Sequence, residues 1–198
     1  MVRPEPHGTM TVEEYLRFDE TSPLKHEYVR GEVYAMSGVT LRHDRIARNV
    51  LIALSAAAGD GPCEAFSSDV RLRAADDIFY YADVTVVCGQ VAELDVIIAD
   101  PCVIVEVTSP STARIDRGEK LNAYRAIQSV RAYLIVDDRR RRVERYWRDS
   151  EAAPWQREEV VGTGDVAIPC LDAELTLDQI YRRVELPAVG EPEAEYDL

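Results

Sequence analysis

The stretch Pro101-Cys102-Val103-Ile104-Val105-Glu106-Val107 decides the fold of this chain. Its apolar side chains fall on both faces of an extended strand, a pattern typical of a central strand that is covered on each side. One acid, Glu106, interrupts the run. Burying a lone carboxylate costs several kcal/mol of folding free energy. Glu106 therefore needs a cation, a cluster of hydrogen-bond donors or a proton. The stretch therefore predicts a buried central strand that carries one costly, and hence informative, acid.

The segments on either side of this strand alternate between helical and strand-like periodicity. Thr11 and Glu14 form a capping-box pattern that begins a short helix, which we expect to end near Pro23. Residues 41–58 carry apolar side chains at helical spacing and are followed by Gly59, which predicts an amphipathic helix. The other expected elements are a hairpin at 26–36, strands near 64–67, 69–73 and 80–88 with a turn at 74–77, a helix at 115–127, and strands at 132–136 and 142–147. This order favours an α/β or α+β fold, in which helices flank a sheet.

Length and charge limit what the chain can be. Its 198 residues, 46% of them hydrophobic, suit a single domain at 10–186, between a loose leader at 1–9 and an acidic tail at 187–198 that we expect to be disordered. A net charge of −13 excludes a simple basic protein that coats DNA. No apolar run approaches the ~20 residues of a membrane span, and the first residues hold no apolar signal core. We therefore expect a cytoplasmic protein without membrane contact.

The four cysteines, Cys63, Cys88, Cys102 and Cys170, stand far apart and include no C-x-x-C pair. Cys88 and Cys102 lie in apolar, strand-like runs, where a free cysteine behaves as a small hydrophobic residue. We therefore expect free structural cysteines, and neither a disulfide framework nor a zinc site.

A second acid in a strand-forming segment is a candidate partner for Glu106. Asp83 lies within Tyr80-Tyr81-Ala82-Asp83-Val84-Thr85-Val86-Val87. If the two strands pair, Asp83 and Glu106 converge at one edge of the sheet, and two carboxylates together with phosphate and water oxygens suit Mg²⁺. Two plainer interpretations stay open: Glu106 pairs with a buried arginine or with backbone donors, and Asp83 is an exposed acid at a strand end.

Lysine is rare in this chain, since only Lys25 and Lys120 among its 23 basic residues are lysine. Lys120 lies in the expected helix at 115–127, at the border of the face that Tyr124 and its neighbours turn to the sheet. An ammonium group there could reach a phosphate or orient an attacking water, because lysine is a compact donor with a tunable pKa. The alternative is an ordinary solvated lysine.

Seven short segments carry a resemblance to a known family. They are Thr11–Leu16 (TVEEYL), His26–Val33 (HEYVRGEV), Asp69–Leu72 (DVRL), Ala82–Val86 (ADVTV), Val105–Thr112 (VEVTSPST), Asp116–Leu121 (DRGEKL) and Tyr133–Asp137 (YLIVD). In this order the segments resemble the Uma2 family of endonucleases, formerly a domain of unknown function, within the PD-(D/E)XK nuclease superfamily. The resemblance runs from about Met10 to Leu186.

The resemblance implies a restriction endonuclease-like core, a mixed β-sheet flanked by helices, with an added N-terminal helix and hairpin. It also implies a Mg²⁺-dependent DNA endonuclease, in which Mn²⁺ can substitute for Mg²⁺. Asp83 and Glu106 would then hold the metal ion, and Lys120 would position water or phosphate. Glu27, in a hairpin that the family retains, either adds a ligand, holds a water, or is a plain surface acid.

Two positions depart from the superfamily pattern. Ala82 stands where the pattern has a proline before the aspartate, and Thr108 stands where it has a lysine two residues after the glutamate. Lys120, on the following helix, would substitute for that lysine. His43 opens the long helix at 41–58 and either approaches this site or, as we expect, stays in solvent.

Other functions fit the sequence less well. Ser109 and Ser111 lack the G-x-S-x-G elbow of a serine hydrolase, and the chain has no P-loop of an NTPase. A catalytically inactive module for binding or assembly stays open because of Thr108 and the acidic charge. For a nuclease, the run Arg139–Arg142 is either a phosphate track or a solvated hairpin tip. A homodimer is expected by analogy, since cutting both strands commonly takes two sites.

Overall fold

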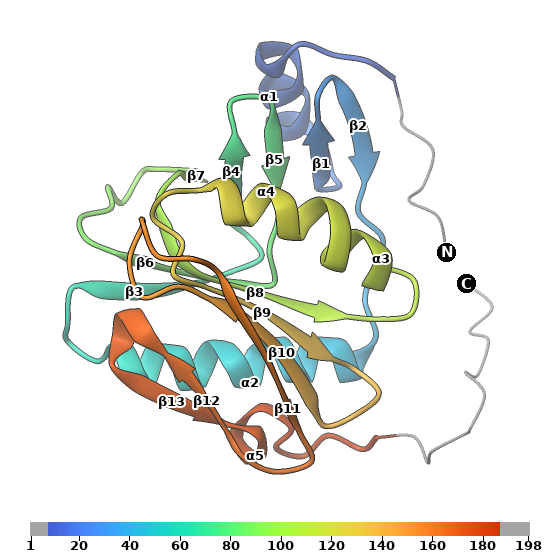
Figure 1. The fold of residues 1–198 in the computed structure, drawn as a ribbon. Coiled ribbons are helices and arrows are strands. Elements are labelled where there is room, and N and C mark those ends of the chain that lie inside the picture. The colour runs from blue at the N-terminus through green and yellow to red at the C-terminus, as the bar shows by residue number, and fades with distance from the viewer. Residues whose placement is uncertain (1–7, 187–198) are drawn as a thin grey trace.

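The computed structural model describes residues 8–186, which form three sheets and the helices that cover them (Figure 1). In chain order the elements are α1 (Val12–Thr21), β1 (His26–Val29), β2 (Glu32–Ala35), α2 (Leu41–Ala58), β3 (Cys63–Ser67), β4 (Arg71–Ala75), β5 (Ile78–Tyr80), β6 (Val84–Cys88), β7 (Ile97–Ile98), β8 (Pro101–Thr108), α3 (Ala113–Ile115), the π-helical turn η1 (Asp116–Lys120), α4 (Leu121–Ala126), β9 (Ala132–Asp137), β10 (Arg142–Trp147), β11 (Gln156–Val161), β12 (Asp165–Ile168), the 3-10 turn η2 (Pro169–Leu171), β13 (Ala173–Thr176) and α5 (Leu177–Ile180). The predicted tail at 187–198 and most of the predicted leader lie outside the described residues. None of the helices in residues 8–186 is both long and apolar enough to cross a membrane.

The central sheet has six strands in the order β11-β10-β9-β8-β6-β3. β8 and β9 run parallel, and the other neighbours in this sheet are antiparallel. All eight residues of β8 are buried, so the prediction of a covered central strand is confirmed. In Figure 1, α2 lies on one side of the sheet and the segment α3–α4 on the other.

The residues of β8 alternate between two cores. Val103, Val105 and Val107 pack in one cluster with the apolar face of α2. Ile104 packs in the second cluster, with Leu121 and other residues of α4. Because side chains alternate along a strand, Glu106 faces the same side as Ile104. The pleat thus turns the acid toward α4 and away from the α2 core.

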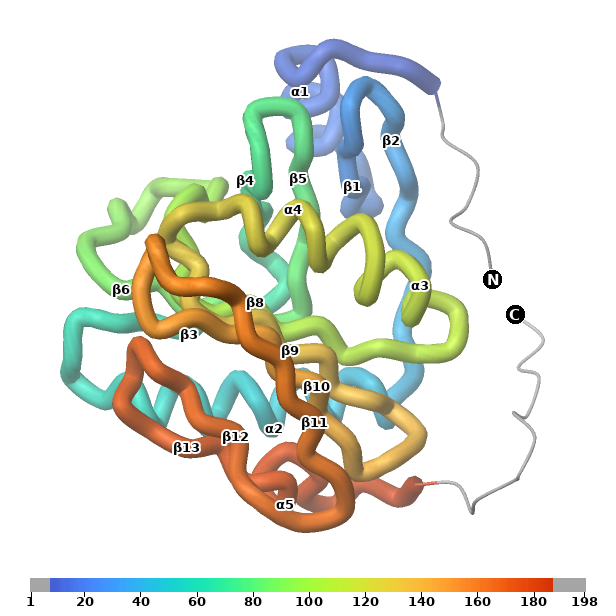
Figure 2. Tube along the Cα trace, in the orientation of Figure 1, coloured from blue at the N-terminus to red at the C-terminus, as the bar shows by residue number. Residues whose placement is uncertain are grey.

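A second, five-stranded sheet has the order β2-β1-β5-β4-β7. The predicted hairpin is its β1–β2 edge, and the predicted capping box of Thr11 and Glu14 is present at the start of α1. Tyr15 of α1 packs against Tyr28 of the hairpin and Phe79 of β5. Figure 2 shows the chain passing from β4 and β5 of this sheet down into the region of the central sheet.

The strand predicted at 80–88 is in fact two strands in two different sheets. β5 ends at Tyr80 in the five-stranded sheet, and β6 begins at Val84 in the central sheet. The predicted turn at 74–77 is shorter, because β4 continues to Ala75. Strand-forming residues continue across this junction, so the sequence could not reveal that the chain changes sheets there.

The helix predicted at 115–127 begins earlier and is not uniform. It starts with α3 at Ala113, continues through the π-helical turn η1 at Asp116–Lys120, and ends with α4 at Ala126. Such π-helical turns are rare and frequently lie at functional sites.

The prediction of free cysteines is wrong. The structure joins Cys63 to Cys88 and Cys102 to Cys170 by disulfides, which leaves no free cysteine in residues 8–186. The sequence separations of 25 and 68 residues explain why spacing did not reveal these pairs.

Candidate active site

Glu106 is the centre of a buried polar cluster between β8 and α4. Its side chain is 6% exposed, and two donors bond to the same oxygen, Oε1. Lys120 Nζ donates at 2.9 Å and the Tyr124 hydroxyl at 2.7 Å. Glu106 therefore pairs with an ammonium group, and not with the buried arginine that the sequence left open.

Lys120 links Glu106 to the N-terminal hairpin. Its Nζ atom lies 2.9 Å from Oε1 of Glu106 and 2.9 Å from Oε1 of Glu27 on β1. The ammonium group also lies over the ring of Tyr80, 5.3 Å from its centroid. The Lys120 side chain is 9% exposed, so it is not the solvated lysine of the alternative interpretation.

Asp83 occupies the junction between the two sheets, immediately before β6. Val84 pairs with Val105 in the antiparallel ladder of β6 and β8, so the next position in this register sets Asp83 beside Glu106. The backbone N–H of Val107 donates to Asp83 Oδ2 at 2.7 Å. The structure thus brings Asp83 and Glu106 to one edge of the ladder, as the predicted strand pairing required.

His43 also reaches this cluster, against our expectation that it stays in solvent. Its Nε2 atom lies 3.0 Å from Asp83 Oδ1, and its side chain is only 12% exposed. Burial lowers the pKa of His43, but the hydrogen bond and the charge of Asp83 outweigh burial and raise the pKa overall. His43 lies in the first turn of α2, so the contact depends on how α2 packs on the sheet.

A second layer of contacts supports η1. Thr108 at the end of β8 donates its hydroxyl to Asp116 Oδ2 at 2.7 Å. The hydroxyl of Tyr133 on β9 donates to the backbone oxygen of Asp116 at 3.1 Å. Thr108 is therefore part of the attachment that fixes η1, the turn that carries Lys120, to β8.

Burial and neighbouring charges set the protonation of the central pair. Burial raises the pKa of Glu106 to about 8; Lys120 opposes this rise, and the charge of Asp83 adds to it. Burial alone would lower the pKa of Lys120, but the carboxylates of Glu106, Glu27 and Asp116 more than compensate and raise it well above its usual value. Lys120 thus keeps its positive charge, whereas the proton of Glu106 is within reach of neutral pH.

The predicted site residues Asp83, Glu106, Lys120 and Glu27 therefore fall in one cluster. Sequence reasoning missed two members. Tyr124 was expected to face the sheet, and its spacing gave no sign that its hydroxyl would bond to Glu106. Asp116 stood inside the DRGEKL segment, which was a signal that we did not use.

The donor set suits a hard divalent cation. Asp83 and Glu106 offer carboxylate oxygens, the ligands that Mg²⁺ prefers. Both hydrogen bonds that the structure gives Glu106 end on Oε1, which leaves Oε2 for a metal ion. The pKa of Glu106 is raised, which marks a carboxylate whose charge Lys120 does not fully compensate. Within residues 8–186, however, the carboxylates do not form a tight group of three, since Lys120 lies between Glu27 and Glu106.

Two of the four arginines in the run at 139–142 pair with acids of neighbouring elements. Arg141 pairs with Asp178, and Arg142 pairs with Glu159 and Glu144. Arg117, next to the site, also pairs with Glu144. Arg117, Arg141 and Arg142 are therefore largely neutralised by these acids, whereas Arg140 is exposed in the bend between β9 and β10.

The chain is similar to several known proteins. A family model named Uma2 and described as "Putative restriction endonuclease" matches residues 12–179. Two uncharacterized proteins of Synechocystis sp. are similar in sequence. The protein sll1609 is 32% identical over 157 residues, which cover 77% of this chain and 88% of that protein. The protein slr1290 is 28% identical over 179 residues, covering 89% and 94%.

A crystal structure from Anabaena variabilis shares the fold. It is described as "a putative nuclease belonging to DUF820", and it superposes with a TM-score of 0.69 at 18% sequence identity. The match covers 87% of this chain and 97% of that one. The mixed sheets flanked by helices are therefore the fold of that protein, as the sequence resemblance implied.

Proposed function

Because the chain belongs to the Uma2 family, we propose that it is a metal-dependent nuclease that hydrolyses phosphodiester bonds of DNA. In this proposal Asp83 and Glu106 hold a divalent cation, with Mg²⁺ as the expected ion and Mn²⁺ as a substitute. Lys120 positions the attacking water or the phosphate, and Glu27 positions Lys120.

The observation that carries the proposal is the contact of Lys120 with Glu106 and Glu27, beside Asp83. A nuclease site needs acids for the metal and a cation close to them for the phosphate. The superfamily's lysine is missing at Thr108, so the proposal depends on another lysine that reaches the same place. Lys120 is the candidate, because it extends from η1 to hydrogen-bond distance from Glu106.

Each residue has a defined task in this mechanism. A bound divalent ion supplies Lewis-acid chemistry, because it lowers the pKa of a bound water and offsets phosphate charge. Val107 and His43 orient the Asp83 carboxylate through their contacts at 2.7 and 3.0 Å. Lys120 keeps its charge, and the N–H group that faces neither Glu106 nor Glu27 would bind an anionic phosphate. Tyr124 holds Oε1 of Glu106, so Oε2 would be the oxygen that binds the metal ion.

The second candidate is an inactive module that keeps the nuclease fold for binding or assembly. One observation favours it: Lys120 already pairs with two of the acids, so part of their charge is balanced without any metal ion. In such a module the cluster would be a buried ion network, retained for structure.

The test is cleavage of supercoiled plasmid DNA with Mg²⁺ or Mn²⁺, in the wild type and in Asp83→Asn. We expect the variant to lose cleavage by at least about 100-fold, since a metal contributes several kcal/mol of transition-state stabilisation. Asp76→Asn is the matched control, because Asp76 is an exposed acid in the β4–β5 turn. The control should cleave like the wild type.

Cleavage that persists in Asp83→Asn would refute the assigned site. If the folded wild type neither cleaves DNA nor takes up Mg²⁺ or Mn²⁺ in a calorimetric titration, the inactive module is the correct alternative. The choice of Mg²⁺, the homodimer and the cytoplasmic location stay predictions of this proposal.

A further inference from the structure

All four cysteines of the chain converge at one place, although Cys63 and Cys170 are 107 residues apart. They come from four elements: Cys63 begins β3, Cys88 ends β6, Cys102 lies at the start of β8, and Cys170 lies in η2. Cys63 and Cys88 face each other directly in the ladder of β3 and β6. The fold therefore gathers every thiol of the chain at one end of the central sheet. We call these four residues the cysteine cluster.

The two disulfides of the cluster are packed against one another. Sγ of Cys88 lies 3.2 Å from Sγ of Cys102, which belongs to the other pair. The sulfurs of Cys88, Cys102 and Cys170 all lie within 4.8 Å of one another, and Cys63 is bonded to Cys88. Two disulfides with a purely structural role would require only that the two cysteines of each pair lie close together. Four sulfurs in one group are the arrangement that a tetrahedral metal ion requires, since Zn–S bonds of about 2.3 Å set the sulfurs about 3.8 Å apart.

We propose that the reduced cysteine cluster is a tetrathiolate site for a soft divalent metal ion, with Zn²⁺ as the ion that it binds. The structure contains the oxidised state of the same four sulfurs. A dithiol reductant supplies two electrons and two protons to each disulfide, which yields two thiols and leaves the reductant as its own disulfide. Zn²⁺ then binds the thiolates, and the thiol protons pass to solvent.

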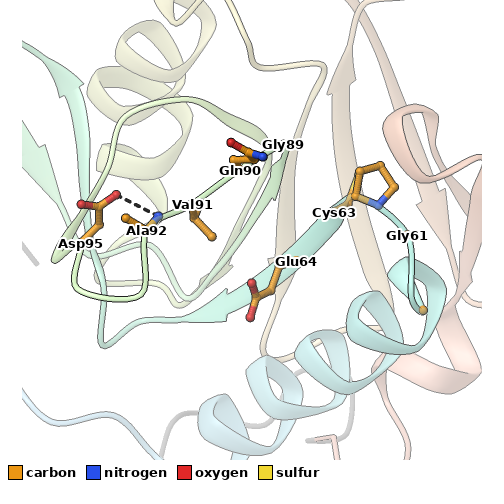
Figure 3. Close-up of a pocket in the computed structure, with 10 residues that line it drawn as sticks. Gly61, Cys63, Glu64, Gly89, Gln90, Val91, Ala92 and Asp95 are labelled. Atoms are coloured by element: carbon orange, nitrogen blue, oxygen red, sulfur yellow. Dashed lines mark hydrogen bonds between the residues drawn. The ribbon is translucent and has the colours of Figure 1, made fainter.

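The surroundings of the cluster fit an ion that enters from solvent. Cys102 is buried, whereas Cys88 is exposed. A hollow of about 940 Å³ adjoins the cluster, and Cys63, Glu64, Gly89 and Asp95 are among the residues that line it. Figure 3 shows Glu64 and Asp95 along this hollow, with the Asp95 carboxylate accepting a hydrogen bond from the backbone N–H of Ala92. These acids attract cations toward the thiols.

The cysteine cluster is separate from the proposed nuclease site. Cys88 follows Asp83 by five positions and Cys102 precedes Glu106 by four, which corresponds to roughly 13–17 Å along the strands. The cluster also ties η2, in the C-terminal part of the chain, to three strands of the central sheet. Metal binding there would clamp β12, η2 and β13 onto that sheet, and it is independent of nuclease activity.

The experiment is a titration of the full chain with Co²⁺ after reduction with a phosphine and removal of metals. Co²⁺ reports thiolate ligands through its near-ultraviolet charge-transfer absorption, and a tetrahedral site through strong visible bands. We expect the thiolate–Co²⁺ bands to saturate at one equivalent bound to the cysteine cluster, and one equivalent of Zn²⁺ to abolish them. The Cys102→Ser and Cys88→Ser variants should each lose these bands, and the second replaces an exposed residue that folding tolerates more easily.

Asp83→Asn separates this proposal from the nuclease, because it should keep the full thiolate–Co²⁺ absorption whatever happens to DNA cleavage. A thiol assay that counts four free thiols in the reduced wild type, with no thiolate–Co²⁺ bands, would overturn the proposal. Bands that remain unchanged in Cys102→Ser and Cys88→Ser would overturn it as well.

Discussion

The cost of burying charge governs the candidate site at the scale of single residues. Glu106, Lys120 and Asp116 are all buried, and Glu27 and Asp83 are partly buried beside them. Lys120 is the central cation of this group, and it contacts two of the carboxylates directly. The carboxylates of this group thus outnumber its one lysine. A divalent cation would reduce the excess negative charge.

Above about pH 8, where Glu106 is ionised, Lys120→Met should destabilise the protein by about 3–5 kcal/mol, because it leaves Glu106 and Glu27 buried without their cation. Urea unfolding of both proteins measures the loss. Adding Glu27→Gln and Glu106→Gln to this variant should recover part of the stability, since neutral amides need no counterion.

The chain offers a matched control in its other lysine. Lys25 pairs with Asp69, whose side chain is 80% exposed, so Lys25→Met should cost less than about 1 kcal/mol. Equal losses in the two lysine variants would contradict the assignment of Lys120 as the cation that the buried acids require.

The raised pKa of Glu106 predicts a pH-dependent response to metal. Below about pH 8 the carboxyl tends to keep its proton, so a metal ion must displace that proton to bind. The Mg²⁺ concentration for half-maximal cleavage should fall as pH rises, by up to about tenfold per pH unit, and level off above the pKa. Mg²⁺ titrations of plasmid nicking at several pH values measure this slope.

His43 must be separated from this effect, because its pKa is also raised and its protonated form pairs with Asp83. In His43→Gln the slope should remain, since we assign the displaced proton to Glu106. A half-maximal Mg²⁺ concentration that does not change with pH in the wild type would contradict the prediction.

At the scale of elements, the π-helical turn η1 is the feature that completes the site. Asp116 and Lys120, at its two ends, are both buried, and they contact Thr108 and Glu106 on the same strand. η1 follows α3 and precedes α4, whose Leu121 and Tyr124 pack in the core. The turn lets the helix keep its apolar side in the core while two charged side chains reach β8.

Gly118→Ala should stabilise the protein by about 0.5–1 kcal/mol. Gly118 lies inside the helical segment, and a Cβ atom added there would meet nothing within 4 Å. Glycine in a helix loses more conformational freedom on folding than alanine does. Urea unfolding measures the gain, and DNA cleavage should not change.

Gly59→Ala is the control of opposite sign. Gly59 follows α2 with φ of +54°, a conformation that side chains other than glycine rarely adopt, so alanine should cost about 1–2 kcal/mol. A loss of stability in Gly118→Ala would show that the backbone at Gly118 also depends on glycine.

Helices and hairpins whose periodicity is local were predicted well. The capping box of α1 and the apolar spacing of α2 marked both elements, because each depends on neighbours within four residues. The prediction of a single strand across the junction between β5 and β6 was wrong for the opposite reason. Strand-forming residues lie on both sides of this junction, so only the strand partners distinguish the two sheets.

At the scale of the whole molecule, the candidate site and the cysteine cluster occupy opposite ends of the same strands. Asp83, immediately before β6, and Glu106 of β8 lie at one end of these two strands, and Cys88 and Cys102 lie at the other. The antiparallel pairing of β6 and β8 produces this arrangement, because the start of each strand lies beside the end of the other. One ladder thus positions both clusters.

The chain's sequence by itself determined which strand must be buried and which acid is costly to bury there. It also identified the lysine that could neutralise that acid. These are local facts of composition and periodicity, which act over a few residues. Only the tertiary structure decided that Glu27 contacts Lys120, that Tyr124 contacts Glu106, that His43 contacts Asp83, and that the four cysteines meet. Those contacts join segments tens of residues apart, and only the packing of sheets and helices brings such segments together.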